Sequence, residues 1–386
     1  MTEFCRKWAK RLVVVLVVVL SPLLAAPVLL SIYLKVRFSL LEPADFDRGG
    51  RASTPPPSAR EVAQELDRIP FSSRIPAPLA IVFVVATDLV VWALNCYHRT
   101  AGLLFPYPAT FQKVVINADD GTPISGMLGL QSGGVSRPAL ILVHGLFDSK
   151  NSSYLLYQAL KAYYRWGFHV LTVDLRGHGT TAAPGSPPSG GGAVEAGDIL
   201  AAARYLKNLD QVGTVGLCGF SFGAATSLLA SALSGDSGLL DGGVVACNGF
   251  GDSRPQVNRI SKDPLFRGML QVFSGLKVGM RCSSFGEYFE EVSAPYYGCS
   301  TEDLYRDSSA VLKVAGIQTP TLVIHSEDDP VIPVEEALKM SEAARDNPMV
   351  GFLIKPEGSH DLYLYTSAAW FSQVLRTFLS HWASCD

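Results

Sequence analysis

One serine of the chain lies in a sequence pattern typical of catalytic nucleophiles. Residues 213–218 form a short apolar run, which continues into Gly219-Phe220-Ser221-Phe222-Gly223 and then into the small-residue stretch AATSLLASAL. A strand, a G-x-S-x-G turn and a helix in that order make a nucleophile elbow, whose glycines permit a sharp, strained turn. The pattern predicts Ser221 as a nucleophile held clear of a sheet, where a base can reach its hydroxyl.

A serine hydroxyl is a poor nucleophile until a base removes its proton and an acid orients that base. In chains with a nucleophile elbow, the acid and the histidine follow the serine in that order. An apolar strand over residues 320–326 is followed by Asp328 and Asp329, and a strand over residues 349–355 is followed by His360. We predict His360 as the base and Asp329, in the D-P-V-I-P run after its strand, as the acid. Asp328 is the alternative acid.

The negative charge that develops on the substrate needs two backbone N–H groups as an oxyanion hole. One donor is expected from Phe222, the residue after the nucleophile. The second is expected from the loop after the strand ALILVHG, in which His144-Gly145 precedes Leu146, with Phe147 as the alternative donor. The imidazole of His144 is then expected to bond to the backbone of this loop.

The segments that carry these residues alternate in type. An antiparallel hairpin is predicted from FQKVVIN and PISGMLGL around the turn Asp119-Asp120-Gly121. Beyond it, strands and helices alternate, which predicts a mostly parallel sheet with helices on both faces. The further strands are expected at 139–145, 168–174, 214–219, 242–248, 320–326 and 349–355, and the helices at about 152–165, 194–208, 222–233, 334–345 and 367–382.

Residues 250–312 interrupt the alternation with aromatic side chains and short helical pieces. An insertion at this point lies above the carboxyl ends of the strands, where ligands bind in open α/β sheets. We therefore interpret it as a cap over the active site. Six of its residues either line an acyl pocket or form the core of the cap, and Phe273 and Phe285, together with Phe147, are predicted to bind substrate. The six are Phe266, Met269, Phe273, Phe285, Tyr288 and Phe289.

The composition predicts that the first hundred residues anchor the chain in a membrane. The chain is 48% hydrophobic and only 17% charged. Residues 12–34 carry no charge and make about 35 Å of helix, enough to span a bilayer. A second apolar stretch, at about 77–95, is broken only by Asp88. We predict one or two spans; the second stretch could instead lie along the membrane or against the catalytic domain.

Between the two apolar stretches, residues 35–76 are predicted as a polar linker. Ser58-Ala-Arg-Glu61 is a capping box that opens a short helix, with Val62, Leu66 and Ile69 on one face. Four basic residues before the first apolar stretch should hold the N-terminus in the cytoplasm. With two spans the catalytic domain returns to the cytoplasmic side of the cell membrane, and this is the topology that we expect.

The rest of the composition narrows the classes of function. The formal net charge of −3 does not favour nucleic acid as a partner. Seven scattered cysteines favour a reducing compartment, although Cys282 and Cys299 could pair. Neither a metal-ligand cluster nor a dinucleotide fingerprint stands in the sequence, so no cofactor is expected. A small-molecule or lipid ester and the membrane are the expected partners, and the oligomeric state stays open.

Taken together, the elbow, the HG loop, D-L-R-G-H-G, DDP and GSH resemble the α/β-hydrolase fold superfamily over residues 110–386. HGLFDSKNSSY and EYFEEVSAPYYGCSTEDLYRDSSAVLKVAGIQTPTLVIHSEDDPVIP more narrowly resemble the YheT-like esterase group. This resemblance implies an α/β-hydrolase catalytic domain that cleaves acyl esters. The eukaryotic relatives of the YheT-like group include membrane-anchored lipid hydrolases. The resemblance does not extend to residues 1–109, which the apolar stretches predict as the anchoring region. A serine peptidase or thioesterase, or a non-catalytic membrane-tethered binding protein, are the alternatives.

Overall fold

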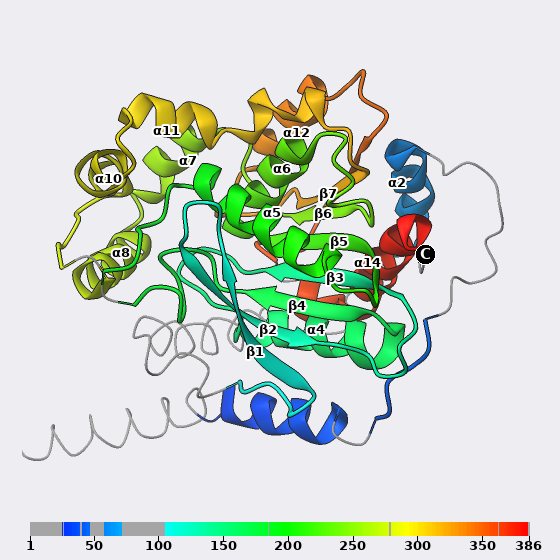
Figure 1. The fold of residues 1–386 in the computed structure, drawn as a ribbon. Helices are drawn as coiled ribbons and strands as arrows, with labels where there is room; N and C mark the ends of the chain where they lie inside the picture. The colour runs from blue at the N-terminus through cyan, green and yellow to red at the C-terminus, as the bar shows by residue number, and fades with distance from the viewer. Residues whose placement is uncertain are drawn as a thin grey trace, which may run out of the picture.

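The computed structural model describes residues 25, 27–38, 41–46, 58–71, 105–183, 185–277, 279–361 and 363–384. Within these residues a single sheet organises the molecule (Figure 1). Its eight strands lie in the order β1-β2-β4-β3-β5-β6-β7-β8, antiparallel from β1 to β4 and parallel across the rest. The strands are β1 Phe111–Asn117, β2 Pro123–Gly129, β3 Arg137–Val143, β4 His169–Val173, β5 Val212–Phe220, β6 Val244–Cys247, β7 Thr321–Ser326 and β8 Val350–Lys355.

Helices cover both faces of the sheet, so its central strands are buried on both sides. One face packs against α5, α6 and α12, and the other against α4 and α14. These helices span α4 Ser153–Trp166, α5 Ala193–Lys207, α6 Phe222–Ser234, α12 Val334–Ala343 and α14 Ala368–Trp382. The hairpin and the alternation predicted from the sequence are therefore confirmed, with every end within two residues of the prediction.

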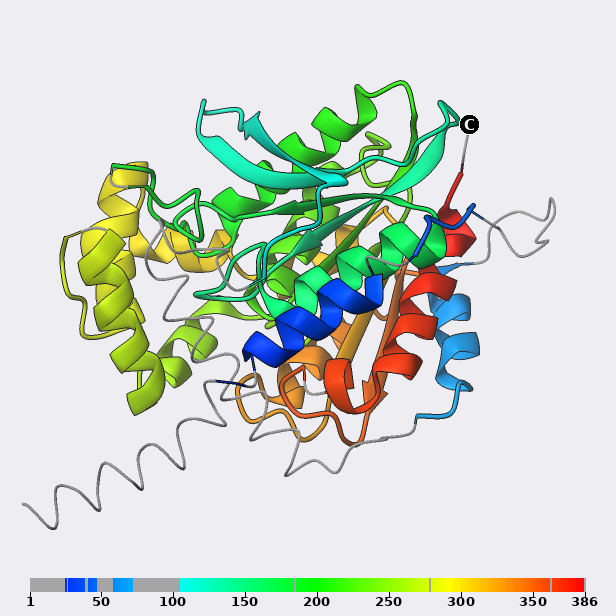
Figure 2. The same ribbon diagram turned by 90° about the horizontal axis from the view of Figure 1, so that it is seen from below.

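The insertion between β6 and β7 forms a separate group of short helices at one side of the sheet, as Figures 1 and 2 show. Its apolar side chains make their own core, to which Phe147 of the loop after β3 also contributes. Cys282 and Cys299 in this group are free thiols, so they do not pair. The helices are α7 Ser253–Ile260, α8 Pro264–Lys277, α9 Phe285–Tyr288, α10 Ala294–Tyr297 and α11 Thr301–Asp307.

Two segments that precede the sheet in sequence belong to its core. The helix over residues 27–38 lies alongside α4 (Figure 2) and buries Leu34 and Phe38 against it. The Phe38 ring centre lies 6.2 Å from that of Tyr157 on α4. Helix α2 (Ala59–Asp67) begins with the predicted capping box at Ser58 and packs against β8 and α14. Residues at the end of the first predicted span and in the predicted linker therefore help to build the domain.

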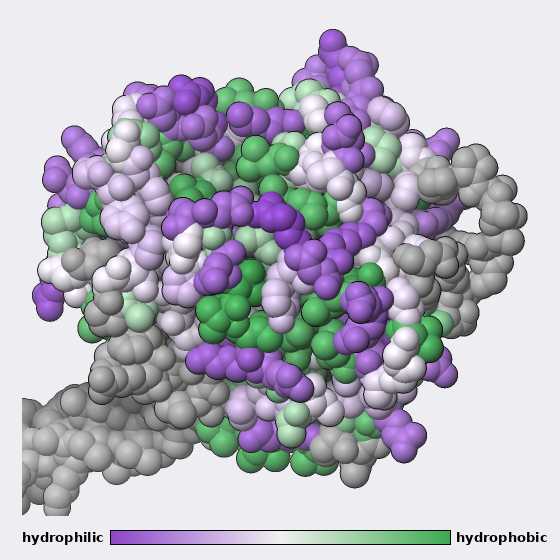
Figure 3. Space-filling model, viewed as in Figure 1, coloured by the Kyte–Doolittle hydropathy of each residue, from purple (hydrophilic) through white to green (hydrophobic). Residues whose placement is uncertain are grey.

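The other parts of the two predicted spans, residues 12–24 and about 77–95, lie outside the described residues. Among the residues that the structure does describe, no helix has both the length and the apolar character that crossing a bilayer requires. On the face shown in Figure 3, hydrophilic side chains are interspersed with hydrophobic ones.

Candidate active site

The turn between β5 and α6 has the strained geometry expected of a nucleophile elbow. Ser221 has φ 53° and ψ −116°, a region that residues other than glycine rarely adopt. A Cβ on Gly219 would lie 2.2 Å from the carbonyl oxygen of Gly223, and one on Gly223 would lie 2.4 Å from that of His144. Only glycine fits at both positions. The N–H of Ser221 donates to the carbonyl of Cys247 (2.8 Å), which fixes the turn to the neighbouring strand.

The structure brings Ser221, His360 and Asp329 together in one chain of contacts. His360 Nε2 lies 2.9 Å from Ser221 Oγ, and His360 Nδ1 lies 2.8 Å from Asp329 Oδ2. The acid follows β7 and the histidine follows β8, so both approach the serine from the carboxyl ends of parallel strands. Residues 139 positions apart in sequence thus share one hydrogen bond.

The surroundings of Asp329 hold its side chain in place. Asp329 Oδ1 accepts hydrogen bonds from the N–H groups of Val331 (2.8 Å) and Ile332 (2.9 Å). Burial opposes ionisation, but His360 and the hydrogen bonds outweigh it and hold the pKa of Asp329 below its usual range. The alternative acid, Asp328, instead accepts from the N–H of Ser359 (2.7 Å) and so fixes the histidine loop.

Asn248 is a further residue of this site that the sequence analysis did not single out. It follows β6, and its Nδ2 donates to Asp329 Oδ2 (2.6 Å) and to the carbonyl of Ser359 (3.1 Å). It therefore ties the acid to the loop that carries His360. Its signal in the sequence was an asparagine directly after a buried strand, at the same sheet edge as Ser221.

The loop after β3 lies directly against Ser221. A Cβ on Gly145 would be 3.4 Å from the Cβ of Ser221, so the next two residues, Leu146 and Phe147, pass beside the serine and line the same cavity. Phe222 is the first residue of α6, and the N–H groups of the first helical turn have no acceptor within the helix. The residues predicted to supply the oxyanion donors thus line the same cavity as Ser221.

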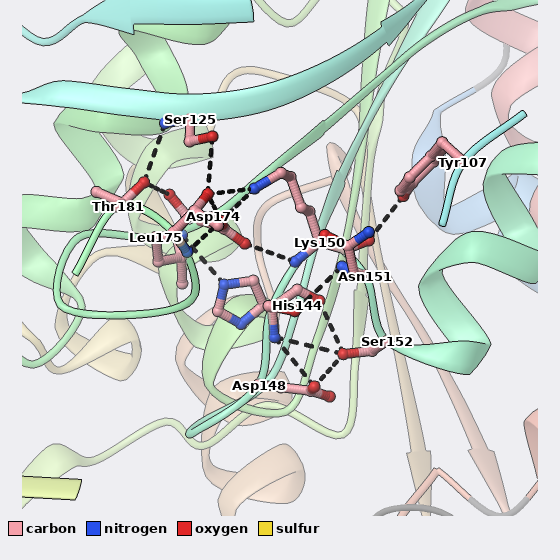
Figure 4. Close-up of polar contacts among 12 residues, drawn as sticks. Tyr107, Ser125, His144, Asp148, Lys150, Asn151, Ser152, Asp174, Leu175 and Thr181 are labelled. Carbon is pink, nitrogen blue, oxygen red and sulfur yellow. Dashed lines mark hydrogen bonds and ion pairs between the residues drawn. The ribbon is translucent and has the colours of Figure 1, made fainter. Parts of the chain in front are cut away.

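His144 has the structural role predicted for it. Its Nδ1 donates to the carbonyl of Gly145 (2.7 Å), and its Nε2 accepts from the N–H of Leu175 (3.1 Å; Figure 4). An imidazole with one donating and one accepting nitrogen is neutral. Burial lowers the pKa of His144, which agrees with this neutral form.

A buried ion pair between Lys150 and Asp174 holds the far end of the same loop (Figure 4). The N–H of Lys150 donates to Asp174 Oδ1 (2.7 Å), and its carbonyl accepts from the hydroxyl of Tyr107 (2.7 Å). Thr180 donates its N–H to Asp174 Oδ2 (2.8 Å). Both charged side chains are almost fully buried, at 3% and 0% exposure. Burial opposes ionisation, but Lys150 keeps the pKa of Asp174 below its usual range.

Replacing Lys150 by Met is expected to lower the free energy of unfolding by about 3–5 kcal/mol, because the Asp174 carboxylate stays buried without its cation. Urea unfolding of the full chain in detergent measures the loss. Arg345→Met is the matched control: Arg345 pairs with Glu342 at the exposed surface, so its loss should stay within about 0.5 kcal/mol. A loss below about 1 kcal/mol in Lys150→Met would contradict this role of the buried pair.

A cavity of about 330 Å³ opens above Ser221, between the sheet and the inserted helices. Ser221, Phe222 and His360 line it, as do all six aromatic and methionine residues predicted from the insertion. Phe273 and Phe285 pack on Phe147, with ring centres 5.0 and 5.6 Å apart. These residues therefore pack in or against the core of the cap and also line the cavity, and the acyl pocket stays a prediction.

His178, in the D-L-R-G-H-G run, also lines the cavity. Its ring stacks on Phe222 (centres 5.8 Å apart) and lies 5.4 Å from that of Phe273. Its Nδ1 lies 2.9 Å from the carbonyl of Arg176. It thus joins the residue after the nucleophile to the cap, which no local pattern could indicate.

A mostly parallel sheet with a serine on a strand-to-helix elbow, and a histidine and an aspartate behind later strands, defines an α/β hydrolase. Residues 140–374 match the alpha/beta hydrolase family, and the chain belongs to it.

Known proteins resemble parts of this chain. The chain is 24% identical over 250 residues to the embryogenesis-associated protein EMB8 of Picea glauca, and 25% identical over 248 residues to an abhydrolase domain-containing protein of Dictyostelium discoideum. Each match covers 58% of this chain but only 53% and 62% of those proteins. The esterase Pf2001 of Pyrococcus furiosus shares the fold, with a TM-score of 0.51 at 19% identity, over 70% of this chain and 92% of the esterase.

Proposed function

We propose that the chain is a serine hydrolase that cleaves carboxylic esters, with Ser221, His360 and Asp329 as its catalytic triad. The observation that carries this proposal is the contact chain from Ser221 Oγ to His360 Nε2 and from His360 Nδ1 to Asp329 Oδ2, at the wall of an apolar cavity. A nucleophile within hydrogen-bond reach of a base, itself oriented by an acid, is the arrangement that acyl transfer needs.

The reaction proceeds in two halves. Ser221 Oγ attacks the ester carbonyl while His360 Nε2 takes its proton, and the oxyanion accepts hydrogen bonds from the N–H groups of Leu146 and Phe222. The carbonyl then re-forms, the C–O bond to the alcohol breaks, and His360 gives the proton to the leaving oxygen. Water next attacks the acyl-enzyme by the same route, which releases the acid and restores the serine.

The walls of the cavity support a medium-length acyl chain as substrate. Helices α7, α8 and α9 contribute mostly aliphatic and aromatic side chains, among them Val257, Leu270 and Phe285. Each buried methylene is worth about 0.8 kcal/mol, or roughly fourfold in affinity. Such a wall therefore favours longer acyl groups until the cavity is full.

We also propose that the enzyme is tethered to the cell membrane, with its catalytic domain on the cytoplasmic side. The uncharged run over residues 12–34 supports the tether. The outer side of the helix over residues 27–38, which exposes Leu29, Ile32 and Val36, continues this apolar character next to the domain. An alkaline phosphatase fused to the C-terminus that is active in bacteria would contradict a cytoplasmic domain.

Hydrolysis of 4-nitrophenyl esters with acyl chains of two to twelve carbons tests the proposed substrate class. We expect kcat/KM to rise about two- to fourfold per methylene from acetate and to reach its optimum at medium length. Met269→Trp, which fills the cavity from α8, should shift the optimum to shorter chains. Leu276→Trp on the exposed side of the same helix should leave it unchanged.

Fastest turnover of acetate, with a steady fall as the chain lengthens, would contradict the acyl pocket. Cleavage of aminoacyl amides with no cleavage of any ester would replace the esterase by a peptidase on the same triad.

A further inference from the structure

Asp361 is a carboxylic acid beside the catalytic histidine that the reaction above does not use. It follows His360 directly and lines the same cavity as Ser221. Its φ of 58° lies in the left-handed region, where aspartate and asparagine are among the few residues other than glycine that occur readily. The hydroxyl of Tyr363 donates to Asp361 Oδ1 (3.1 Å). Among the described residues no hydrogen-bond donor contacts Oδ2.

The position of Asp361 relates it to the alcohol part of an ester. His360 Nε2 must hand its proton to the leaving oxygen, so the alcohol has to lie beside the imidazole. The cavity residues that follow the imidazole in the chain are Asp361, Leu364 and Tyr365. Tyr154 of α4 lines the same region, and its hydroxyl is close enough to Asp361 for the carboxylate to act on its pKa, after the larger effects of burial and Asp148.

The two sides of the cavity thus differ in chemistry. The inserted helices contribute mostly apolar side chains, with Ser253 and Gln256 as exceptions. The carboxylates and further hydroxyls of Asp148, Tyr154, Asp361 and Tyr365 come from the loop after β3, from α4 and from the segment after β8. Asp148 already accepts from the N–H of Ser149 (3.0 Å), and the hydroxyl of Tyr365 lies 3.1 Å from that of Ser153. Asp361 adds a carboxylate to this side of the cavity, and among the described residues no donor occupies its Oδ2.

We propose that Asp361 selects esters whose alcohol carries hydroxyl groups and no negative charge, that is, monoesters of a polyol such as glycerol. This inference rests on the proposed ester hydrolysis and names the alcohol that the same site takes. A carboxylate accepts hydrogen bonds from hydroxyl groups, and such charge-assisted bonds are roughly twice as strong as neutral ones. An alcohol with a phosphate would bring a second negative charge next to it and would be disfavoured.

The charge state of Asp361 agrees with this role. The net pKa of Asp361 is raised to about 7: burial, the largest cause, and Asp329 raise it, whereas His360 and Tyr363 lower it. Above neutral pH the group is therefore mainly a carboxylate, which accepts hydrogen bonds and repels anions. Measurements at about pH 8 test it in that form.

Three butyrate esters with the same carbon skeleton separate the effect of the alcohol's hydroxyl groups from that of a negative charge. They are 1-butyrylglycerol, propyl butyrate, which lacks the two hydroxyls, and 1-butyrylglycerol 3-phosphate. With the full chain in detergent we expect kcat/KM for the glycerol ester to exceed that for the propyl ester at least tenfold. A site that hydrogen-bonds a substrate hydroxyl rejects an analogue without it, because its own polar group is left unpaired.

Two variants then separate the effect of the hydrogen-bond acceptor at Asp361 from the effect of its negative charge. Asp361→Gly accepts the positive φ and removes the acceptor, so the glycerol preference should fall to within twofold while propyl butyrate changes less than threefold. Asp361→Asn keeps an acceptor and removes the charge, so it should retain part of the glycerol preference and raise turnover of the phosphate ester about three- to tenfold. Glu357→Gln, an exposed carboxylate outside the cavity in the same loop, is the matched control and should change none of the three rates.

An unchanged glycerol preference in Asp361→Gly, or an equal loss for all three esters, would overturn the inference, since the carboxylate would then only support His360. If that variant does not fold, the wild type still decides, because a preference for propyl butyrate contradicts the proposal. A wild type that hydrolyses none of the esters would reject the proposed function instead.

Discussion

Replacement of Ser221 by alanine is expected to abolish ester turnover and labelling by a fluorophosphonate probe, while the protein stays folded. The substitution removes only the hydroxyl group, which is the proposed nucleophile beside His360. In serine hydrolases the loss of the nucleophile lowers kcat by about 10⁶-fold, and only binding and oxyanion stabilisation remain. Hydrolysis of 4-nitrophenyl butyrate and gel-based probe labelling of the wild type and the variant measure both effects.

Ser253→Ala is the matched control. Ser253 lines the same cavity, and its hydroxyl has no hydrogen-bond partner among the described residues, so its removal should change turnover less than about threefold. Ser221→Gly should be equally inactive but more stable than the wild type by roughly 1 kcal/mol, because glycine adopts φ 53° without strain. Probe labelling that persists in Ser221→Ala would assign the nucleophile to another residue. A wild type that is never labelled would contradict the proposed serine hydrolase activity.

The parts of the site that were predictable are those with a local signature. The strand, the elbow and the helix around Ser221 follow one another within about twenty residues. Steric crowding requires glycine at positions 219 and 223, and these glycines can be read directly in the sequence. His360 and Asp329 each follow a strand at the edge where parallel strands must meet, so the fold class placed them once it was recognised.

The parts that were missed depend on neighbours across the sheet. Asn248 reaches Asp329 because β6 lies beside β7, although the two residues are 81 positions apart. Lys150 and Asp174 pair across adjacent loops, and each alone reads as an ordinary charged residue of a loop. Asp361 carries no motif at all. Its proposed role follows from its place in the cavity between the inserted helices and the sheet.

Hydrophobicity alone misassigned part of the N-terminal region. An apolar run gives the same signal whether lipid or protein covers it. Leu34 was assigned to the predicted span, yet it is 2% exposed because it packs against α4. Helix α2 was assigned to the linker, but Ala59, Val62 and Leu66 are buried against the sheet and α14. The catalytic domain therefore uses chain on the N-terminal side of residue 110.

Replacement of Asp329 by asparagine is expected to lower kcat by about 10⁴-fold while probe labelling continues slowly. The amide oxygen will stay where Asp329 Oδ1 accepts from the N–H groups of Val331 and Ile332. The amide NH₂ then replaces Oδ2 and faces His360 Nδ1 as a donor. The imidazole must accept there, so its proton moves to Nε2, which can no longer take the proton of Ser221.

The same NH₂ group would also face Nδ2 of Asn248, which is itself a donor. Two donors without an acceptor in a buried site cost about 1–3 kcal/mol, so we expect Asp329→Asn to lose stability by that amount as well. Asp328→Asn is the matched control: its amide oxygen can still accept from the N–H of Ser359, so turnover should fall only a few-fold. If Asp328→Asn were the inactive variant and Asp329→Asn retained turnover, the two acids would exchange roles, and the orienting contact would have to run through the loop of Ser359 instead.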